Sequence, residues 1–185
     1  MRVWKIFDNY RRGALGSLMS LARRLASWPR KSYYPTMSVD IVSRKAGSKI
    51  SRRNVKKIAL KVLELMKHDG AELSLGLVDN KEIQALNARF RKKDAPTDVL
   101  AFPADKRLAL EGPLLGDVII SVEKAKEQAE ERKRSLHEEI VTLLIHGILH
   151  LIGYDHERSA RDARIMGRLE KKIYRMLCEQ GLLRV

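Results

Sequence analysis

The sequence predicts an α+β fold: one compact domain with a four-stranded sheet and about five helices, preceded by a basic N-terminal extension. The length of 185 residues suits a single domain. Beyond residue 36, short apolar runs typical of strands are interspersed with longer segments whose apolar residues recur every three or four positions, as in helices. The composition changes at the same point. We therefore divide the chain into an extension, residues 1–36, and a folded domain, residues 37–185.

The first elements of the domain are a strand and a helix. Apolar Val39 and Ile41 alternate with polar residues, which indicates a strand. Ser51 is suited to cap a helix that runs to about His68, with its apolar residues on one face. Gly70 is predicted to end this helix.

The middle of the domain alternates strands and helices. Residues 73–78 are apolar enough for a buried strand, and a helix is predicted over residues 81–90. A short strand over residues 98–102 is stopped by Pro103, which cannot donate a ladder hydrogen bond. Residues 104–113 are predicted to form a loop.

The last part supplies the fourth strand and three more helices. The strand is predicted over residues 116–122, followed by a Lys/Glu-rich helix to about Arg132. A further helix spans residues 135–151 and is closed by Gly153. The final helix begins after Ser159, where an acid three residues later resembles a capping box.

The charge and cysteine content narrow the class of protein. The chain carries 37 Lys and Arg against 23 Asp and Glu, a formal net charge of +14. Such an excess attracts polyanions, so nucleic acid and anionic membranes are the first partners to consider. The single cysteine, Cys178, excludes an internal disulfide framework and a Cys-rich zinc finger. No apolar run is long enough to predict a membrane-spanning segment.

The extension carries half of the net charge. Its apolar residues recur at spacings of three and four, which indicates an amphipathic helix with basic flanks. Its basic residues are Arg2, Lys5, Arg11, Arg12, Arg23, Arg24, Arg30 and Lys31, against the single acid Asp8. Three interpretations stay open: a helix that contacts RNA or an anionic membrane, a signal or transit sequence, or a floppy extension preceding a translation start at Met37.

Three histidines near the C-terminal end of the domain have the spacing of a metal site. His146 and His150 are four residues apart, which places both imidazoles on one face of a helix. Gly153 can adopt a positive φ and reverse the chain, so that His156 returns towards them. Three neutral nitrogen ligands leave a fourth tetrahedral position open, as in catalytic zinc sites. We therefore predict one bound Zn²⁺, although nickel or another divalent ion also suits three imidazoles.

The same spacing occurs in the metzincin peptidases, with one difference. Those enzymes have a glutamate directly after the first histidine, which takes the proton from the attacking water. This chain has Gly147 there. The ligand set is present and the general base of a protease is missing, which argues against proteolysis.

Other polar residues near this motif have alternative interpretations. His137 lies nine residues before the first motif histidine, on the opposite side of the helix, and His68 lies at a helix end, so neither is expected to bind metal. Asp155 either orients a ligand or solvates the turn. Thr142 and Glu139, one and two turns before the motif, are further candidates to support a ligand.

Three blocks of the sequence resemble the YbeY family. The histidine signature HGILHLIGYDH covers residues 146–156, LNARFRKKDAPTDVLAFP covers residues 86–103, and LGDVIIS covers residues 115–121, in the order that the family has them. The likeness runs from about Ser38 to Leu177. It departs from the family pattern at Ala101, where serine is usual, and it leaves residues 1–36 unexplained.

This resemblance implies a zincin-like fold and a zinc-dependent endoribonuclease specific for single-stranded RNA. The implied role is rRNA maturation at the 3′ end of 16S rRNA and ribosome quality control, in the cytoplasm. The implied partners are RNA and the small ribosomal subunit; DNA is not expected. The extension adds possible contact with an anionic membrane. The alternative function is a non-catalytic ribosome-assembly or RNA-binding factor whose metal is structural.

The resemblance also implies a functional arginine, Arg91, close to the metal. A guanidinium can hold two phosphate oxygens at once and stabilise the charge that develops on them. Neighbouring Arg89, Lys92 and Lys93 are expected to attract phosphate in general. A second basic run either extends this surface or is the exposed side of a helix; it comprises Arg44, Lys45, Lys49, Arg52, Arg53, Lys56 and Lys57. The general base is not assigned, with Asp155 a candidate only if its carboxylate turns towards the metal.

Overall fold

The computed structural model describes residues 38–43, 50–104 and 114–183, and these ranges form four strands and five helices. The elements are β1 (Ser38–Ser43), α3 (Arg52–Leu65), β2 (Glu72–Val78), α4 (Asn80–Arg91), β3 (Val99–Pro103), β4 (Leu114–Ser121), α5 (Val122–Glu131), α6 (Leu136–Ile152) and α7 (Ala160–Glu179). The predicted α+β class and four-stranded sheet are confirmed. The extension, most of the predicted loop over residues 104–113, and the basic residues before position 50 lie outside the described residues.

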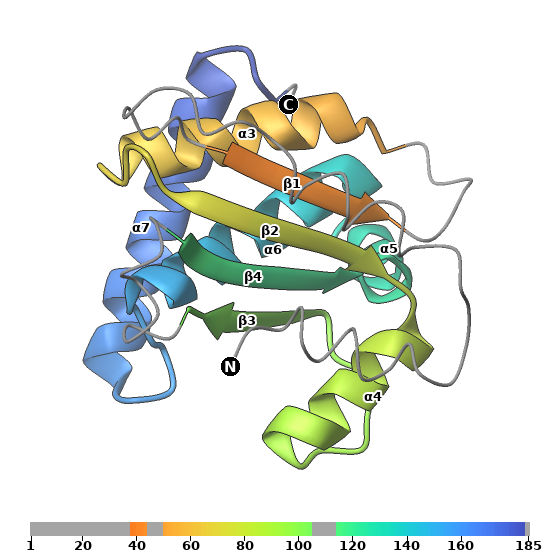
Figure 1. Cartoon of the computed structure of the whole chain (residues 1–185). Coiled ribbons are helices and arrows are strands. Elements are labelled where there is room, and N and C mark those ends of the chain that lie inside the picture. The colour runs from red at the N-terminus through yellow and green to blue at the C-terminus, as the bar shows by residue number, and fades with distance from the viewer. Residues whose placement is uncertain (1–37, 44–49, 105–113, 184–185) are drawn as a thin grey trace, which may run out of the picture.

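The sheet has the strand order β1-β2-β4-β3. The first three of these strands run parallel, and β3 runs antiparallel to β4 at the edge of the sheet (Figure 1). Helices α3, α5, α6 and α7 lie on one face, at the back in Figure 1, and enclose the main core. Helix α4 packs near β3 and β4 in a second, smaller cluster with Leu100 and Ile119. The edge strand β3 therefore has helical structure near both of its faces.

Helix α6 is the central element of the main core. It begins with a capping box, in which the Ser135 hydroxyl accepts the Glu138 N–H and the Glu138 carboxylate accepts the Ser135 N–H. Ten of its 17 residues are buried. No described helix alone has the length and hydropathy to cross a bilayer; α5 and α6 satisfy that criterion only together, across a bend of 113°.

Gly147 lets α6 approach the sheet closely. A Cβ atom built at this glycine would lie 2.6 Å from Cγ1 of Val118 in β4, closer than real Cβ atoms come. Val118 is completely buried and β-branched, so it has little freedom to move aside. The absence of a side chain at residue 147 therefore sets the depth at which α6, with the histidines on either side of Gly147, lies against β4.

Most predicted boundaries agree with the structure to within two residues, but the predicted end of the first helix is wrong. Helix α3 ends at Leu65, three residues before His68. Lys67 adopts a left-handed conformation with φ of 57°, which breaks the helix before Gly70 is reached. Gly70, with φ of 84°, instead turns the chain into β2.

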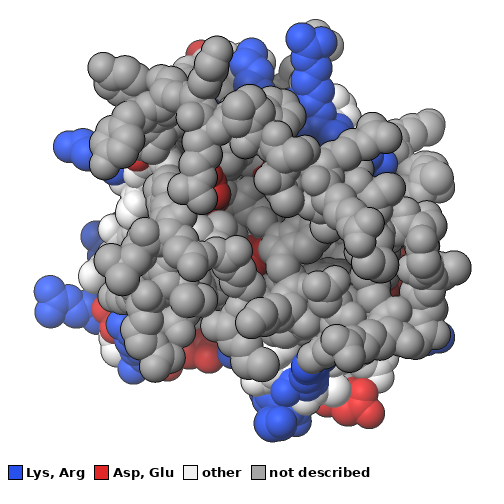
Figure 2. Space-filling model, in the orientation of Figure 1, with Lys and Arg blue, Asp and Glu red and all other residues white. Residues whose placement is uncertain are grey.

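Lys and Arg side chains project from several sides of the molecule in the view of Figure 2. The described part of the second basic run is exposed on α3, which packs against β1 at the opposite edge of the sheet from β3. These residues are Arg52, Arg53, Lys56 and Lys57. Of the two interpretations of this run, the structure favours the exposed side of a helix.

The contact at Gly147 predicts a specific loss of stability. Replacing Gly147 by alanine should lower the free energy of unfolding by about 1–3 kcal/mol, because the methyl group overpacks against Val118. The matched control is Gly167→Ala in α7, where an added Cβ meets nothing within 4 Å and alanine should stabilise the helix. Thermal unfolding of both variants measures the difference; equal melting temperatures would contradict the prediction.

Candidate metal centre

Three imidazole rings converge beside the edge of the sheet. His146 and His150 come from α6, and His156 comes from the turn that follows it. One ring nitrogen from each histidine lies within 4.8 Å of the other two. The ring centroids are 4.7, 5.0 and 5.1 Å apart. The structure thus brings together the three residues that the spacing picked out, and it places them as a metal site requires.

The return of His156 depends on the end of α6. Gly153 adopts φ of 105°, and its N–H donates to the carbonyl of His150. The next N–H, from Tyr154, donates to the carbonyl of Leu149 at 3.0 Å, which completes a helix-ending turn. The predicted closure of the helix by glycine is confirmed, and it directs the following residues back towards the helix face that carries the first two histidines.

The donor set fits a tetrahedral metal ion. Two nitrogens that bind one zinc at about 2.0–2.1 Å lie about 3.3 Å apart at a tetrahedral angle. The Nε2 atoms of His146 and His150 lie 3.1 Å apart. Burial, followed by the nearby imidazoles of His146 and His156, lowers the pKa of His150. A lowered pKa keeps this ring neutral at pH 7, which is the form that binds a metal.

Glu170 of α7 contacts the first of the three histidines. Its Oε1 lies 2.7 Å from Nδ1 of His146. In the tautomer that carries its proton on Nδ1, His146 donates a hydrogen bond to this carboxylate and turns Nε2 towards the other histidines. Sequence reasoning missed this residue because it is 24 positions away, on another helix. One signal was available: Glu170 shares the apolar face of α7 with Met166 and Ile173, where a carboxylate needs a partner.

Neither residue proposed on α6 supports the ligands. Glu139 is completely buried, and its carboxylate oxygens form ion pairs with Arg132 and Arg134 at 2.5 Å. Thr142 donates to the carbonyl of Glu138 and accepts a hydrogen bond from Arg134. Both suggestions are corrected, because these side chains hold the start of α6 to the segment before it.

The remaining predicted residues lie apart from the cluster or belong to its turn. His137 and His68 are absent from the three-histidine group, as expected. Asp155 accepts hydrogen bonds from the N–H of Glu157 at 2.9 Å and from Nε of Arg158 at 3.2 Å. The backbone hydrogen bond and the nearby Arg158 lower the pKa of Asp155. Its carboxylate therefore stabilises the turn, the second of the two roles considered for it.

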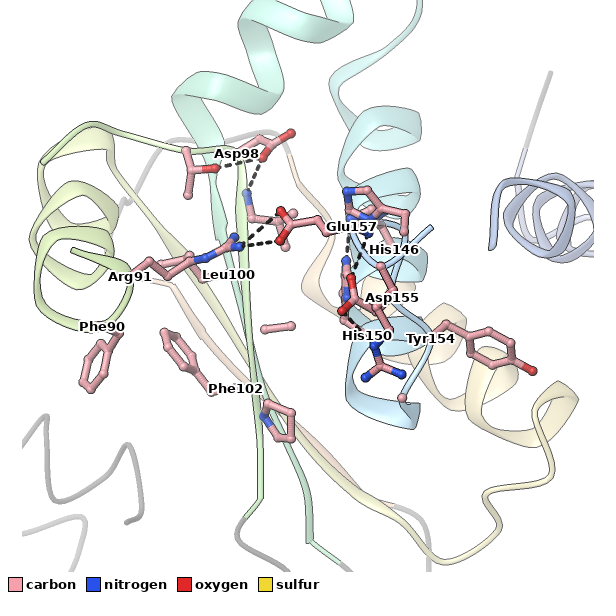
Figure 3. Close-up of a pocket in the computed structure, with 18 residues that line it drawn as sticks. Phe90, Arg91, Asp98, Leu100, Phe102, His146, His150, Tyr154, Asp155 and Glu157 are labelled. Carbon is pink, nitrogen blue, oxygen red and sulfur yellow. Dashed lines mark hydrogen bonds and ion pairs between the residues drawn. The ribbon is translucent and has the colours of Figure 1, made fainter. Parts of the chain in front are cut away.

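A cleft of about 770 Å³ opens over the histidines (Figure 3). One wall is formed by the histidines and residues 153–158, and the other by the end of α4 with residues 97–103. Side chains on β3 alternate between the two faces of the sheet: Val99 and Ala101 pack against the main core, and Leu100 and Phe102 belong to the second cluster. The cleft therefore runs along the outer edge of β3, with which no other described strand pairs.

Arg91 reaches across this edge. Its Nη2 atom lies 3.2 Å from both carboxylate oxygens of Glu157, the residue directly after His156 (Figure 3). Helix α4 ends at Arg91 because the next residue, Lys92, adopts a left-handed conformation. The loop that follows is held to the helix by Nδ2 of Asn87, which donates to the carbonyl of Ala95 at 2.7 Å. The structure thus places Arg91 in the same cleft as the histidines, with a carboxylate as its present partner.

The contact between Glu170 and His146 predicts a change in metal affinity. Replacing Glu170 by alanine should weaken zinc binding about 10- to 100-fold, because His146 loses the acceptor that fixes its ring. Competition with a chromophoric chelator measures this affinity. Glu179→Ala, which removes an exposed carboxylate from the same helix, is the control. Unchanged affinity in Glu170→Ala would show that the carboxylate does not support the ligand.

Comparisons with known proteins agree with this arrangement. The family model "Endoribonuclease YbeY" matches residues 40–178. A protein named endoribonuclease YbeY from Sulfurihydrogenibium sp. is 47% identical over 131 residues, covering 70% of this chain and 86% of its own. One of the same name from Aquifex aeolicus is 40% identical over 125 residues, covering 68% and 83%.

A solved structure shares the fold. The solution structure of TM1509 from Thermotoga maritima is 30% identical, with a TM-score of 0.56, and the match covers 78% of this chain and 91% of that one. The family match spans both walls of the cleft, including Arg91 and all three histidines. This chain belongs to the YbeY family.

Proposed function

We propose that this chain is a metal-dependent endoribonuclease, which hydrolyses phosphodiester bonds in RNA. The observation that carries the proposal is the convergence of three imidazole nitrogens, within 4.8 Å of one another, in an open cleft that also holds an arginine. The two relatives described above, both named endoribonuclease YbeY, are consistent with this activity. The formal charge of +14 favours a polyanionic substrate.

One zinc ion is the cofactor we propose, held by His146, His150 and His156. Zinc in such a site polarises a phosphate oxygen and makes water acidic enough to attack near neutral pH. Nothing in the three-imidazole set excludes another divalent ion, so metal content and metal-dependent activity have to be measured together.

We propose that Arg91 binds the phosphate that reacts. In the structure its guanidinium is paired with the carboxylate of Glu157, and both side chains are about half exposed, at 46% and 59%. An ion pair between exposed side chains is weak, typically about 0–1 kcal/mol, so a phosphate can displace the carboxylate. The guanidinium then offers two parallel N–H donors to the phosphate and balances the charge added during attack.

The general base is not supplied by the residues that sequence analysis considered. Asp155 is engaged by the N–H of Glu157 and by Arg158, so its carboxylate is held in the turn. Gly147 occupies the position of the glutamate that zinc peptidases use, and a Cβ atom at this position would overlap Val118. The attacking nucleophile is therefore either the 2′-hydroxyl of the RNA or water. Peptide hydrolysis is disfavoured, because the glutamate that zinc peptidases use is missing.

The substrate and the cellular role of this activity can be proposed in more detail. We propose that the substrate is single-stranded RNA, in maturation of the 3′ end of 16S rRNA and in ribosome quality control, with the small ribosomal subunit as partner and the cytoplasm as location. The resemblance of the three sequence blocks supports this assignment. Contact of residues 1–36 with an anionic membrane remains a prediction from their charge.

Cleavage of single-stranded RNA by the metal-loaded protein tests the proposed function. His150→Ala should lose both stoichiometric metal and cleavage, whereas His137→Ala, outside the histidine group, should keep both. A chelator should stop cleavage by the unchanged protein. Equal cleavage by His150→Ala would reveal a contaminating nuclease. Absence of chelator-sensitive cleavage by the unchanged protein, with ribosome assembly still supported by both variants, would favour the non-catalytic assembly factor.

A second prediction concerns Arg91. Arg91→Ala should lower kcat/KM for RNA about 100-fold, the typical cost of removing one donor to a developing anion. Lys93→Ala removes the same charge from the adjacent loop, outside the residues that line the cleft, and should cost less than tenfold. Arg91→Lys should recover only part of the activity, because lysine lacks the two-pronged geometry. Equal losses in the alanine variants would reduce the role of Arg91 to general attraction.

A further inference from the structure

An aromatic ring is exposed in the cleft beside Arg91. Among the described residues, the large hydrophobic side chains that are exposed are Val42, Phe90 and Ile165. Of these, only Phe90 lines the cleft, and 36% of it is accessible to solvent. Because Phe90 lines the cleft, the exposed third of its side chain is available to contact a ligand bound there.

Phe90 is held by a second aromatic ring. Phe102 of β3 lies with its centroid 5.2 Å away, at an interplanar angle of 70°, in the edge-to-face arrangement that aromatic pairs favour. Phe102 is itself partly buried in the second cluster, against Leu100 and Ile119. The pair therefore forms an aromatic platform, which we define as Phe90 and Phe102, anchored to the sheet at its inner end and open to the cleft at its outer end.

The guanidinium group of Arg89 already lies over the exposed ring of Phe90. The guanidinium carbon of Arg89 lies over Phe90, 5.4 Å from the ring centroid. Arg89 is an exposed side chain at the end of α4, so it can leave the ring without disturbing the core. The ring face is accordingly reachable from solvent, and it suits a flat, π-bonded group of the kind that stacks on aromatic side chains.

The platform and the histidines lie on different sides of β3. Phe102 points to the α4 face of the sheet, while the histidines of α6 belong to the opposite face. Arg91, the residue directly after Phe90, crosses the edge between them to reach Glu157 (Figure 3). A nucleotide bound with its phosphate at Arg91 therefore has an aromatic surface on one side and the imidazoles on the other.

We propose that the aromatic platform stacks one unpaired base of the RNA, adjacent to the phosphate held at Arg91. The inference rests on the proposed function, and it names a base subsite for that substrate. A base in a duplex has both faces covered by its neighbours, whereas a base in a single strand can turn out and stack on phenylalanine. The platform thus gives a structural reason for the cleft to select single-stranded RNA.

Binding of a single-stranded uridine oligomer to the full chain tests this proposal, with chelator present to prevent cleavage. Phe90→Leu keeps an apolar side chain but removes the ring face, and it should weaken binding at least about fivefold, the lower end of one base–aromatic stack. Phe90→Trp should bind at least as tightly as phenylalanine. Ile165→Ala, which removes an exposed apolar side chain outside the cleft, should leave the affinity unchanged.

An oligomer of abasic ribose phosphates separates stacking from phosphate binding. Phe90→Leu should bind it as well as the unchanged protein does, because no base is present to stack. Three outcomes would each overturn the platform. The unchanged protein and Phe90→Leu could bind the uridine oligomer equally well, or Phe90→Leu could lose the same affinity for both oligomers. Phe90→Trp could also lose as much affinity for the uridine oligomer as Phe90→Leu does.

Cleavage assays on the same proteins keep the two proposals apart. Base-dependent binding without metal-dependent cleavage by the unchanged protein would refute the nuclease and leave the platform standing. Metal-dependent cleavage with no base-dependent difference in binding would refute the platform and leave the nuclease standing.

Discussion

The outer edge of β3, the last strand of the described sheet, brings the two walls of the cleft within reach of each other. A helix on one face of a sheet is normally separated from groups on the other face by the sheet itself. Because β4 is the only described strand that pairs with β3, Arg91 at the end of α4 can pass around β3 and contact Glu157, which is 66 residues later in the chain. The same strand contributes Phe102 to one side of the cleft and packs Ala101 towards the other. If another strand extended the sheet beyond β3, these groups would no longer share a cavity.

The two walls differ in how firmly they are held. His146 and His150 project from a helix whose inner face is buried and capped at both ends, and Glu170 fixes one of the two rings. Arg91 and Glu157 are exposed side chains joined by a weak ion pair. The structure therefore combines a pre-formed ligand set with a phosphate-binding group that can adjust. This division suits a substrate whose backbone is flexible and whose reacting phosphate has to be brought to a fixed position.

Sequence periodicity predicted what depends on local geometry. The four-residue spacing of His146 and His150 and the turn at Gly153 follow from helix geometry and glycine conformation, and both are present in the structure. Contacts between distant segments could not be predicted in this way. Glu170 was missed because its pairing depends on how α7 packs on α6, and Glu139, which is near the histidines in sequence, instead pairs with two arginines. The predicted end of α3 was wrong because Lys67 adopts a left-handed backbone conformation, which a lysine in the sequence does not indicate.

The close contact at Gly147 also restricts how this scaffold can evolve. The glutamate of a zinc peptidase would have to start from a Cβ that overlaps the buried Val118, so it requires α6 or β4 to move. Such a movement would displace the histidines on either side of Gly147 in α6. The mutation that introduces a proteolytic carboxylate would therefore damage the ligand geometry on which that carboxylate depends. In this helix packing, the obstacle to a carboxylate at residue 147 therefore lies in the hydrophobic core rather than in the metal chemistry.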